Sequence, residues 1–362
     1  MMLFDAHLDL AALAVNGRDL RAPLDRAMPP HPPAAVTLPA LRDAGITRCL
    51  GTIFTAPGEA DQPDGYPVGD AQAAHDVGTR QLDIYHDLAR TGDIRLAGAR
   101  SSTPHHDPSP GGIELGILME NADPIRTPDE LPWWAERGVV AIGMAWWASS
   151  RYAAGNGVDP ADADADFGLS DLGRELVRTI DALGLVHDQS HLADSATRDL
   201  FDTTDALVIA SHSNCRALVS TGNPRDDQRH LTDDTIREII RRGGVIGLNL
   251  VRNFIARGLD PKTPQRPTID AALDHVEHIC AIAGNTNHVG LGTDMDGGIT
   301  ADDLVGGIDQ PNDLAKLGDG LRGRGWNDES VNAFLSENWH RCLAGVLTGA
   351  STDELARATP KH

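Results

Sequence analysis

Residues 170–191 read SDLGRELVRTIDALGLVHDQSH and decide the fold class, because they contain one whole helix followed by one strand. Ser170 is a typical helix cap, apolar positions recur after it at steps of three and four, and Gly184 is a typical stop. The apolar run 185–191 then predicts a buried strand that ends at His191. A helix that leads directly into a buried strand is the repeating unit of a parallel sheet with helical crossovers.

The same alternation continues along the whole chain. Apolar runs rich in Val, Ile and Leu are separated by amphipathic stretches, and we interpret the following runs as strands: 3–9, 46–54, 114–120, 139–146, 185–191, 206–212, 244–250 and 288–294. Eight such strands suit a closed (β/α)8 barrel, and 362 residues with 41% hydrophobic content are enough for one. We interpret a further short run, 95–99, as an approach to the third strand.

The rest of the chain fits a single barrel domain over residues 1–362 with insertions. Residues 22–38 and 56–69 are rich in Pro and Gly, so we expect long loops over the active-site face of the barrel. Residues 328–348 predict a C-terminal helix that packs outside the barrel, with an apolar face formed by Val331, Phe334, Leu335, Cys342, Leu343 and Val346.

Charge and composition exclude several classes of partner. A formal charge of −22 without a basic patch argues against nucleic acid and against an anionic membrane surface. No stretch has the roughly 20 apolar residues of a membrane helix, and the start, MMLFDAHLDL, does not resemble a signal peptide. We therefore expect a cytoplasmic protein. The four cysteines are widely spaced, so they indicate neither a thiolate zinc site nor a redox pair.

Residues able to bind metal occur where the predicted strands end. The first run ends in His7 and Asp9, whose spacing places both side chains on one face of a strand. The third run ends in Glu120, whose burial requires a cation or a proton. Two further runs end in His191 and His212, and imidazole is a preferred zinc ligand. Each motif alone is also compatible with a polar turn or a hydrogen-bonded histidine, but their presence at one rim favours a metal site.

The last predicted strand carries two carboxylates. Asp294 and Asp296 lie in GTDMDG, which is also compatible with an Asp-Gly turn. A carboxylate beside a metal-bound hydroxide is well placed to take a proton from the water and pass it to a leaving amine. We interpret Asp294 as this proton-transfer group and Asp296 as a supporting or substrate-binding residue.

Taken in order, these motifs resemble the amidohydrolase superfamily and, within it, the membrane (renal) dipeptidases of peptidase family M19. The resemblance covers nearly the whole chain and rests on FDAHLDL, GILMENAD, GLSDLGRELVRTIDALGLVHDQSH, ASHSNCRAL, RHLTDDTIREI, HVGLGTDMDG and RGWNDESVNAFLSENWHRCL. It implies a metallo-dipeptidase with two zinc ions per chain and a homodimer as its assembly. Carboxylate ligands also accept other divalent metals, so zinc comes from the resemblance rather than from the residues.

The resemblance also implies a role for each position. His7 and Asp9 would bind one zinc ion, His191 and His212 the other, and Glu120 would bridge both together with a hydroxide that attacks the amide. Asp294 takes the general acid/base position. Arg229 falls where the family places an arginine that holds the substrate carboxylate, a task that suits the forked donors of a guanidinium.

One position departs from the family pattern. Where characterised dipeptidases have a histidine near the scissile carbonyl, this chain reads GMAWWASSRYAAG, and Trp146 aligns with that histidine. An indole cannot bind metal, but its N–H can donate one hydrogen bond. Trp146 is therefore either a packing residue or a changed wall of the substrate pocket, and Arg151 or Tyr152 are candidates for the missing polar contact.

Three functions stay open at this point. The first is a zinc dipeptidase acting on L-X or L-D dipeptides, and the second is a hydrolase of another small amide or lactone, such as an N-acyl amino acid or a cyclic amide. The third is a barrel that binds a small ligand without turnover, which the complete set of metal ligands argues against.

Overall fold

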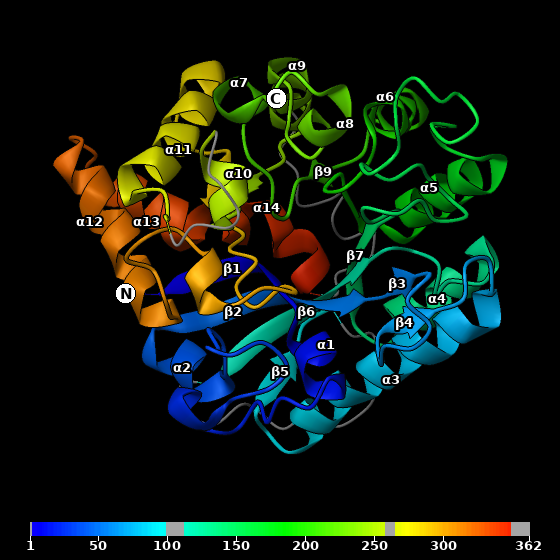
Figure 1. The fold of residues 1–362 in the computed structure, drawn as a ribbon, viewed down its shortest axis with the longest axis horizontal. Helices are drawn as coiled ribbons and strands as arrows, with labels where there is room; N and C mark the ends of the chain where they lie inside the picture. Colours follow the sequence, from blue (N-terminus) through cyan, green and yellow to red (C-terminus); the bar gives the residue numbers. More distant parts are fainter. Residues whose placement is uncertain (1, 99–111, 258–264, 349–362) are drawn as a thin grey trace.

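The computed structural model describes residues 2–98, 112–257 and 265–348, and a parallel barrel forms its centre (Figure 1). The barrel strands are β1 (Leu3–Leu8), β2 (Ile46–Phe54), β6 (Ile113–Glu120), β7 (Val139–Gly143), β8 (Val186–Asp188), β9 (Val208–Ile209), β10 (Ile246–Leu248) and β11 (Val289–Leu291). They follow one another around the barrel in chain order, and a parallel bridge from Ala210 to Ile246 connects β9 with β10. The predicted (β/α)8 fold is confirmed.

Helices surround the strands, as expected for crossover connections (Figure 1). Their bounds are α1 (Leu10–Val15), α2 (Leu38–Asp43), α3 (Ala71–Arg90), α4 (Leu131–Ala135), α5 (Asp171–Leu183), α6 (Asp194–Thr203), α7 (Arg216–Val219), α8 (Pro224–Asp227), α9 (Asp233–Arg241), α10 (Arg252–Ile255), α11 (Ile269–Ala283) and α12 (Ala315–Gly323). The predicted signals of α5 are both present, because the Ser170 hydroxyl accepts the N–H of Gly173 at 3.0 Å and Gly184 adopts a left-handed φ of 64°.

Several strands are shorter at their carboxyl ends than the apolar runs suggested. The predicted strand 185–191 is observed as β8, which ends at Asp188, and the predicted strand 288–294 is observed as β11, which ends at Leu291. His191 and Asp294 have left-handed φ angles of 68° and 58°, a conformation that no extended strand contains. The chain therefore turns sharply at these residues.

The short run at 95–99 forms a strand outside the barrel. β5 (Ile94–Leu96) pairs with the first residues of β6, and β7 pairs with β6 only from Ile117 onwards. β5 and β7 therefore pair with the same edge of β6, β5 with its first residues and β7 with its later ones. This is the position expected for a segment that leads into the third barrel strand. Residue 99 lies outside the described residues.

The C-terminal segment closes one end of the barrel, which corrects its predicted position outside. It consists of α13 (Asp328–Asn332), a π-helical turn (Ala333–Glu337) and α14 (Asn338–Leu347). Trp339 and Leu343 belong to the cluster of strand side chains that includes Phe4 and Leu118. The indole N–H of Trp339 donates to the carbonyl of Leu291 at 2.8 Å, and a Cβ at Gly290 would lie only 2.3 Å from its Nε1. The helix therefore fills the end opposite the site.

The two predicted loops lie at the other end. Residues 22–38 contain one short 3-10 turn, Leu24–Arg26, and residues 56–69 contain a small two-stranded sheet of β3 (Ala56–Pro57) and β4 (Gly65–Tyr66). Both loops contribute residues to the cavity described below. In the described part of the chain, none of the helices has both the length and the apolar character needed to cross a membrane.

Candidate metal centre

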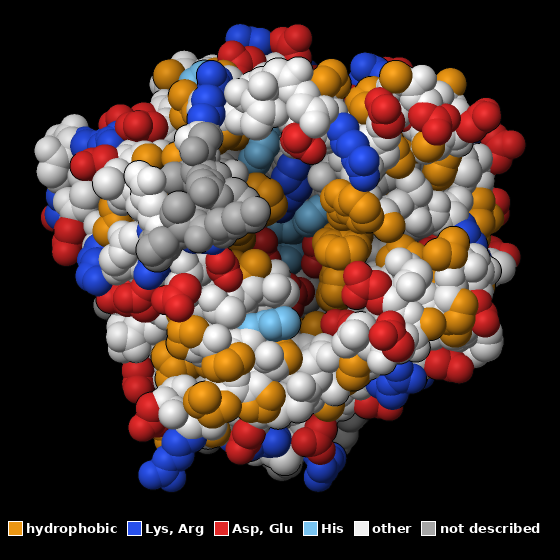
Figure 2. Space-filling view, viewed as in Figure 1, with side chains coloured by type: hydrophobic (Ala, Val, Ile, Leu, Met, Phe, Trp, Pro, Cys, Tyr) orange, Lys and Arg blue, Asp and Glu red, His pale blue; other side chains and the backbone are white. Residues whose placement is uncertain are grey.

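A cavity of about 1060 Å³ opens at the carboxyl ends of the barrel strands. Figure 2 shows it as a hollow near the middle of this face, with histidine and arginine side chains inside it. Its lining includes Glu120, His191, His212, Arg229 and Asp294. Active sites of (β/α)8 barrels form at this end because each strand delivers its last side chain there.

The first cluster of candidate ligands is His7, Asp9 and Glu120. The Nε2 of His7 lies 3.2 Å from Oε2 of Glu120 and 3.9 Å from Oδ1 of Asp9. All three side chains are buried. β1 ends at Leu8, and Asp9 follows it as the residue before α1, so the two ligands flank the end of the strand rather than both lying within it.

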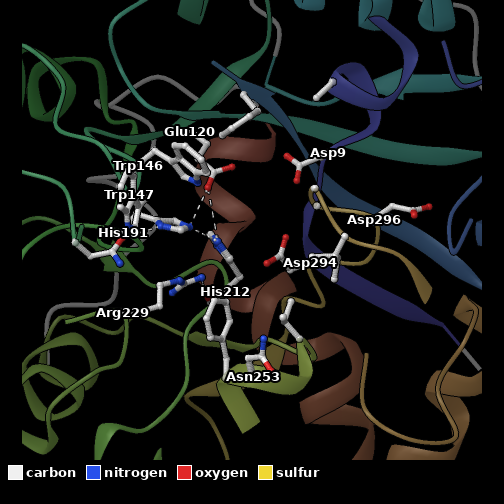
Figure 3. Close-up of a pocket in the computed structure, with 18 of the residues that line it drawn as sticks. Asp9, Glu120, Trp146, Trp147, His191, His212, Arg229, Asn253, Asp294 and Asp296 are labelled. Carbon is white, nitrogen blue, oxygen red and sulfur yellow. Dashed lines mark hydrogen bonds and ion pairs between the residues drawn. The ribbon is translucent and has the colours of Figure 1, made fainter. Parts of the chain in front are cut away.

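The second cluster is His191 and His212, and Glu120 contacts it with its other oxygen. Oε1 of Glu120 lies 3.2 Å from Nε2 of His191 and 3.7 Å from Nε2 of His212. Figure 3 shows Glu120 above the two imidazoles, with Asp9 and Asp294 across the same space. One carboxylate therefore lies between the two clusters, in the position of a bridging ligand.

The hydrogen-bond partners of the two histidines are compatible with a cation between them. Nδ1 of His191 lies 2.9 Å from Oδ1 of Asn156, which can only accept, and Nδ1 of His212 lies 2.8 Å from Oγ of Ser211. With protons on both Nδ1 atoms, the two Nε2 atoms would present lone pairs to each other at 2.9 Å. That approach is repulsive unless a cation lies between them, and imidazole nitrogens with carboxylates suit zinc and similar divalent metals.

The charged groups shift one another strongly. Burial opposes the charge on His7, but Glu120, Asp9 and Asp294 outweigh it and raise the pKa of His7 to about 10. Burial raises the pKa of Asp9 to about 7 and that of Asp294 to about 6. Burial also acts to raise the pKa of Glu120, but His7 and His191 prevail and hold it below its usual value. Three carboxylates in one buried site thus require positive charge nearby.

Asp294 lies at the edge of this site in a restrained position. The side-chain amide of Asn249 donates to its Oδ2 at 2.9 Å, and its backbone is left-handed. A Cβ at Gly297 would lie 1.9 Å from Oδ1 of Asp294 and 2.8 Å from Oδ2 of Asp9. Only glycine therefore leaves the two carboxylates their present positions.

Arg229 reaches the cavity from the segment after α8. Its guanidinium donates to the carbonyl of His212 at 2.8 Å and to the hydroxyl of Ser213 at 3.1 Å, and it lies over the ring of Phe254. Its Nε has no hydrogen-bond partner among the described residues. Burial lowers the pKa of Arg229 below its usual value. A partly unsatisfied, oriented guanidinium next to the second cluster is suited to hold an anionic group.

Trp146 forms part of the cavity wall. Its ring packs edge-on against Phe54 at 5.0 Å between centroids, and it lies 6.3 Å from the ring of His191. It is neither fully buried nor fully exposed. The indole therefore forms the cavity wall beside His191.

Tyr152 does not reach the site, which corrects the prediction that it binds substrate. It is fully buried, it is absent from the cavity lining, and its hydroxyl donates to the carbonyl of Ile125. Arg151, the other candidate for the missing contact, is bound to Asp123 at 3.2 Å. Residues 151 and 152 turn away from the cavity because they anchor the segment before α5 to the loop after β6.

Asp296 lines the cavity but is engaged elsewhere. Its Oδ2 accepts from Arg18 at 2.8 Å and from the backbone N–H groups of Ala35 and Val36. Oδ2 is therefore occupied by contacts within the protein, while Oδ1 has no hydrogen-bond partner among the described residues. The supporting or substrate-binding role of Asp296 stays a prediction.

Sequence reasoning missed a set of polar residues around the candidate site. Thr52, Asn156 and Ser211 contact candidate ligands, Asn249 contacts Asp294, and Asp188 contacts Ser211. Ser211 directly precedes His212, and Asn249 lies within the run 244–250, next to its last residue, so both were close to features already recognised. No local pattern marks Asn156, which lies in the Gly-flanked stretch after the two tryptophans.

Comparisons with known proteins identify a family for this chain. The sequence profile of a family described as membrane dipeptidase (peptidase family M19) matches residues 1–356. An uncharacterised protein of Klebsiella pneumoniae, from the region 5′ of pqqA, is 31% identical over 210 residues, which are 58% of this chain and 73% of that protein. An uncharacterised dipeptidase of Schizosaccharomyces pombe, C965.12, is 38% identical over 133 residues, which are 36% of this chain and 29% of that protein.

Solved structures show the same fold. The probable dipeptidase PvdM of Pseudomonas aeruginosa superposes with a TM-score of 0.75 at 18% identity, covering 97% of this chain and 96% of the other. A metallopeptidase of Rhodobacter sphaeroides, solved with a phosphinate mimic of the dipeptide L-Ala-D-Ala, superposes with a TM-score of 0.74 at 24% identity, covering 95% of this chain and 99% of the other.

Proposed function

This chain belongs to the membrane dipeptidase family, peptidase family M19, and we propose that it is a binuclear-zinc dipeptidase. Its substrates would be short peptides with a free C-terminal carboxylate. The observation that carries this proposal is the position of Glu120, whose two carboxylate oxygens face His7 on one side and His191 with His212 on the other. A single carboxylate shared by two ligand clusters is the arrangement that a pair of metal ions needs.

The ligand set divides naturally between two ions. His7 and Asp9 would hold one, His191 and His212 the other, and Glu120 would contact both. Two bound divalent cations would supply a hydroxide nucleophile at neutral pH, polarise the scissile carbonyl and stabilise the developing oxyanion. Zinc fits the imidazole and carboxylate donors, and manganese or cobalt would be accepted by the same residues.

Asp294 would transfer the proton. It borders the first cluster, and burial raises the pKa of its carboxyl above the usual value, which favours proton uptake. The amide of Asn249 orients one of its oxygens, so the other is free to face the reacting atoms. Asp294 would receive the proton of the attacking water and deliver it to the leaving amine.

Arg229 would select the substrate. Its guanidinium is held by the carbonyl of His212 and the hydroxyl of Ser213, and Arg229 lines the cavity beside the second cluster, where its positive charge would attract a carboxylate. A C-terminal carboxylate fixed here would place the preceding amide beside the second cluster. Very short peptides then fit better than proteins, because the chain must end at Arg229.

Trp146 supports a second candidate, the hydrolysis of another small amide or lactone such as an N-acyl amino acid or a cyclic amide. The indole occupies the wall beside His191, where the family pattern has a histidine. It removes a polar contact and adds an apolar surface, which favours a substrate with an apolar group near the scissile bond. The cytoplasmic location and the homodimer expected from the sequence stay predictions.

The experiment is a measurement of kcat/KM for the zinc-reconstituted protein over L-L and L-D dipeptides, with metal content determined on the same sample. The L-D compounds are included because the Rhodobacter sphaeroides metallopeptidase was solved with an L-Ala-D-Ala mimic. The same peptides with an amidated C-terminus serve as controls, since they cannot engage Arg229. If the protein binds two metal ions and cleaves only the peptides with a free carboxylate, the result supports the dipeptidase function. If it binds two metal ions but cleaves no dipeptide, the result favours the second candidate function.

A further inference from the structure

One hydroxyl group lies beneath both ligand clusters. Ser211 follows β9 and is fully buried, and its Oγ lies 3.1 Å from Nδ1 of His7 and 2.8 Å from Nδ1 of His212. These two histidines belong to different clusters. The rings stack on each other with 3.6 Å between centroids, so both approach the same oxygen from one side.

The single proton of this hydroxyl is directed to a third group. Ser211 donates to Oδ2 of Asp188 at 2.5 Å, while Oδ1 of Asp188 accepts the backbone N–H groups of Ser190 at 3.1 Å and of Ser211 at 2.8 Å. Among the described residues, the Ser190 hydroxyl at 3.4 Å is a second and more distant acceptor for this proton. In either case Oγ faces the imidazoles with its lone pairs and can only accept from them.

With the hydroxyl proton given to Asp188, each of the two imidazoles donates to Oγ from a protonated Nδ1. This tautomer leaves Nε2 as the atom that can bind a metal, and each Nε2 faces Glu120. The backbone that carries the hydroxyl is held in place by close approach of the adjoining strands, because a Cβ at Gly247 or Gly292 would lie within 2 Å of the Ser211 carbonyl oxygen.

We propose that Ser211 is a positioning residue for both metal sites, in which one hydroxyl sets the tautomer and ring orientation of His7 and His212 together. This inference rests on the proposed binuclear site. It predicts that loss of the hydroxyl weakens metal binding at both positions at once. Asn156 offers the natural comparison, because its Oδ1 contacts His191 alone, at 2.9 Å.

The test measures metal binding rather than turnover. Zinc affinity and stoichiometry are determined by competition with a chelator for the full-length wild type, Ser211→Ala and Asn156→Ala, and the cobalt-substituted proteins are compared by absorption spectroscopy. We expect Ser211→Ala to lose roughly 10- to 100-fold in affinity for both ions and to change the cobalt spectrum of both sites. Asn156→Ala should lose affinity of similar size for one ion and leave the other unchanged.

Two controls separate positioning from general damage. Ser336→Ala removes another buried hydroxyl, one without a hydrogen-bond partner among the described residues, and should leave both affinities unchanged. Ser211→Thr keeps the hydroxyl and should bind both zinc ions as the wild type does. If Ser211→Ala does not fold, the zinc affinities of Ser211→Thr are the ones that test the inference. If Ser211→Ala folds and binds two ions as tightly as the wild type, or weakens only one, the inference is wrong. If the wild type itself binds only one ion, the binuclear function and this inference both fail.

Discussion

Nη1 of Arg18 lies 2.8 Å from Oδ2 of Asp296, and neither side chain is exposed to solvent. Arg18 also donates to the carbonyls of Pro29 and Val36, so the pair ties the loop 22–38 to the segment after β11. Asp294 is two residues from this anchor. A buried ion pair thus holds the wall of the cavity next to the proposed proton-transfer residue.

Arg18→Met should lower the free energy of unfolding by about 3–5 kcal/mol, because it leaves the carboxylate of Asp296 buried without its cation. Urea unfolding monitored by circular dichroism measures the change. The double variant Arg18→Met/Asp296→Asn should recover part of the loss. An Arg18→Met protein as stable as the wild type would show that the pair is not needed for folding.

Asp294→Asn should keep both metal ions but lower kcat by about 100-fold or more, since the amide cannot carry a proton between water and the leaving amine. Metal content by atomic emission and kcat on a dipeptide are measured on one sample. Normal turnover in this variant would exclude Asp294 as the proton-transfer group.

Glu120→Gln should weaken binding of both ions, because the amide removes the negative charge that faces both clusters. His212→Ala should remove only the second ion. Zinc titration of the two variants at neutral pH distinguishes them. If Glu120→Gln binds two zinc ions as tightly as the wild type, the carboxylate of Glu120 does not bridge the two ions.

Arg229→Met should raise KM for dipeptides at least 10-fold, by removing the cation that holds the substrate carboxylate. The difference between free-acid and amidated peptides should then disappear. Steady-state kinetics on both peptide series measures this. Unchanged kcat and KM would show that the carboxylate is bound elsewhere.

The free energy of unfolding should fall with acidification because of His275, a buried residue that belongs to neither ligand cluster. Burial lowers its pKa to about 4 from an ordinary value of 6.5, and its ring accepts from the N–H of Cys215 and contacts the carbonyl of Ile255. The folded state prefers the neutral ring, so its contribution is complete above pH 6.5 and is lost between about pH 6.5 and 4.

The loss from this one group is roughly 3 kcal/mol, at about 1.4 kcal/mol for each pKa unit. Urea unfolding of the apoprotein between pH 7 and 4 should show a smaller decline for His275→Gln than for the wild type, since glutamine keeps a donor and an acceptor but does not titrate. Identical pH slopes would assign the decline to other groups.

Much of the fold could be predicted because its signals are local. Each barrel strand appears as an apolar run, and the caps Ser170 and Thr232 lie beside the helices that they begin. The candidate ligands His7, Glu120 and His212 lie at strand ends, where chain order alone places them at one rim. A barrel brings successive strand ends together, so the local pattern was enough.

The exact ends of the strands were harder to predict. His191 and Asp294 extend apolar runs in sequence, yet their left-handed backbones turn the chain out of the sheet. Tyr152 was misplaced for a related reason, because its ring direction depends on the loop after β6 that it packs against.

The sequence by itself determined the fold class, the ligand types and their order around the rim, because apolar periodicity and helix caps act over a few residues. Only the tertiary structure decided which polar groups meet behind those ligands. Ser211 contacts His7 from 204 residues away, and Arg18 contacts Asp296 from 278 residues away. Such pairings depend on the register of the closed barrel and on mutual burial, and no local pattern contains that information.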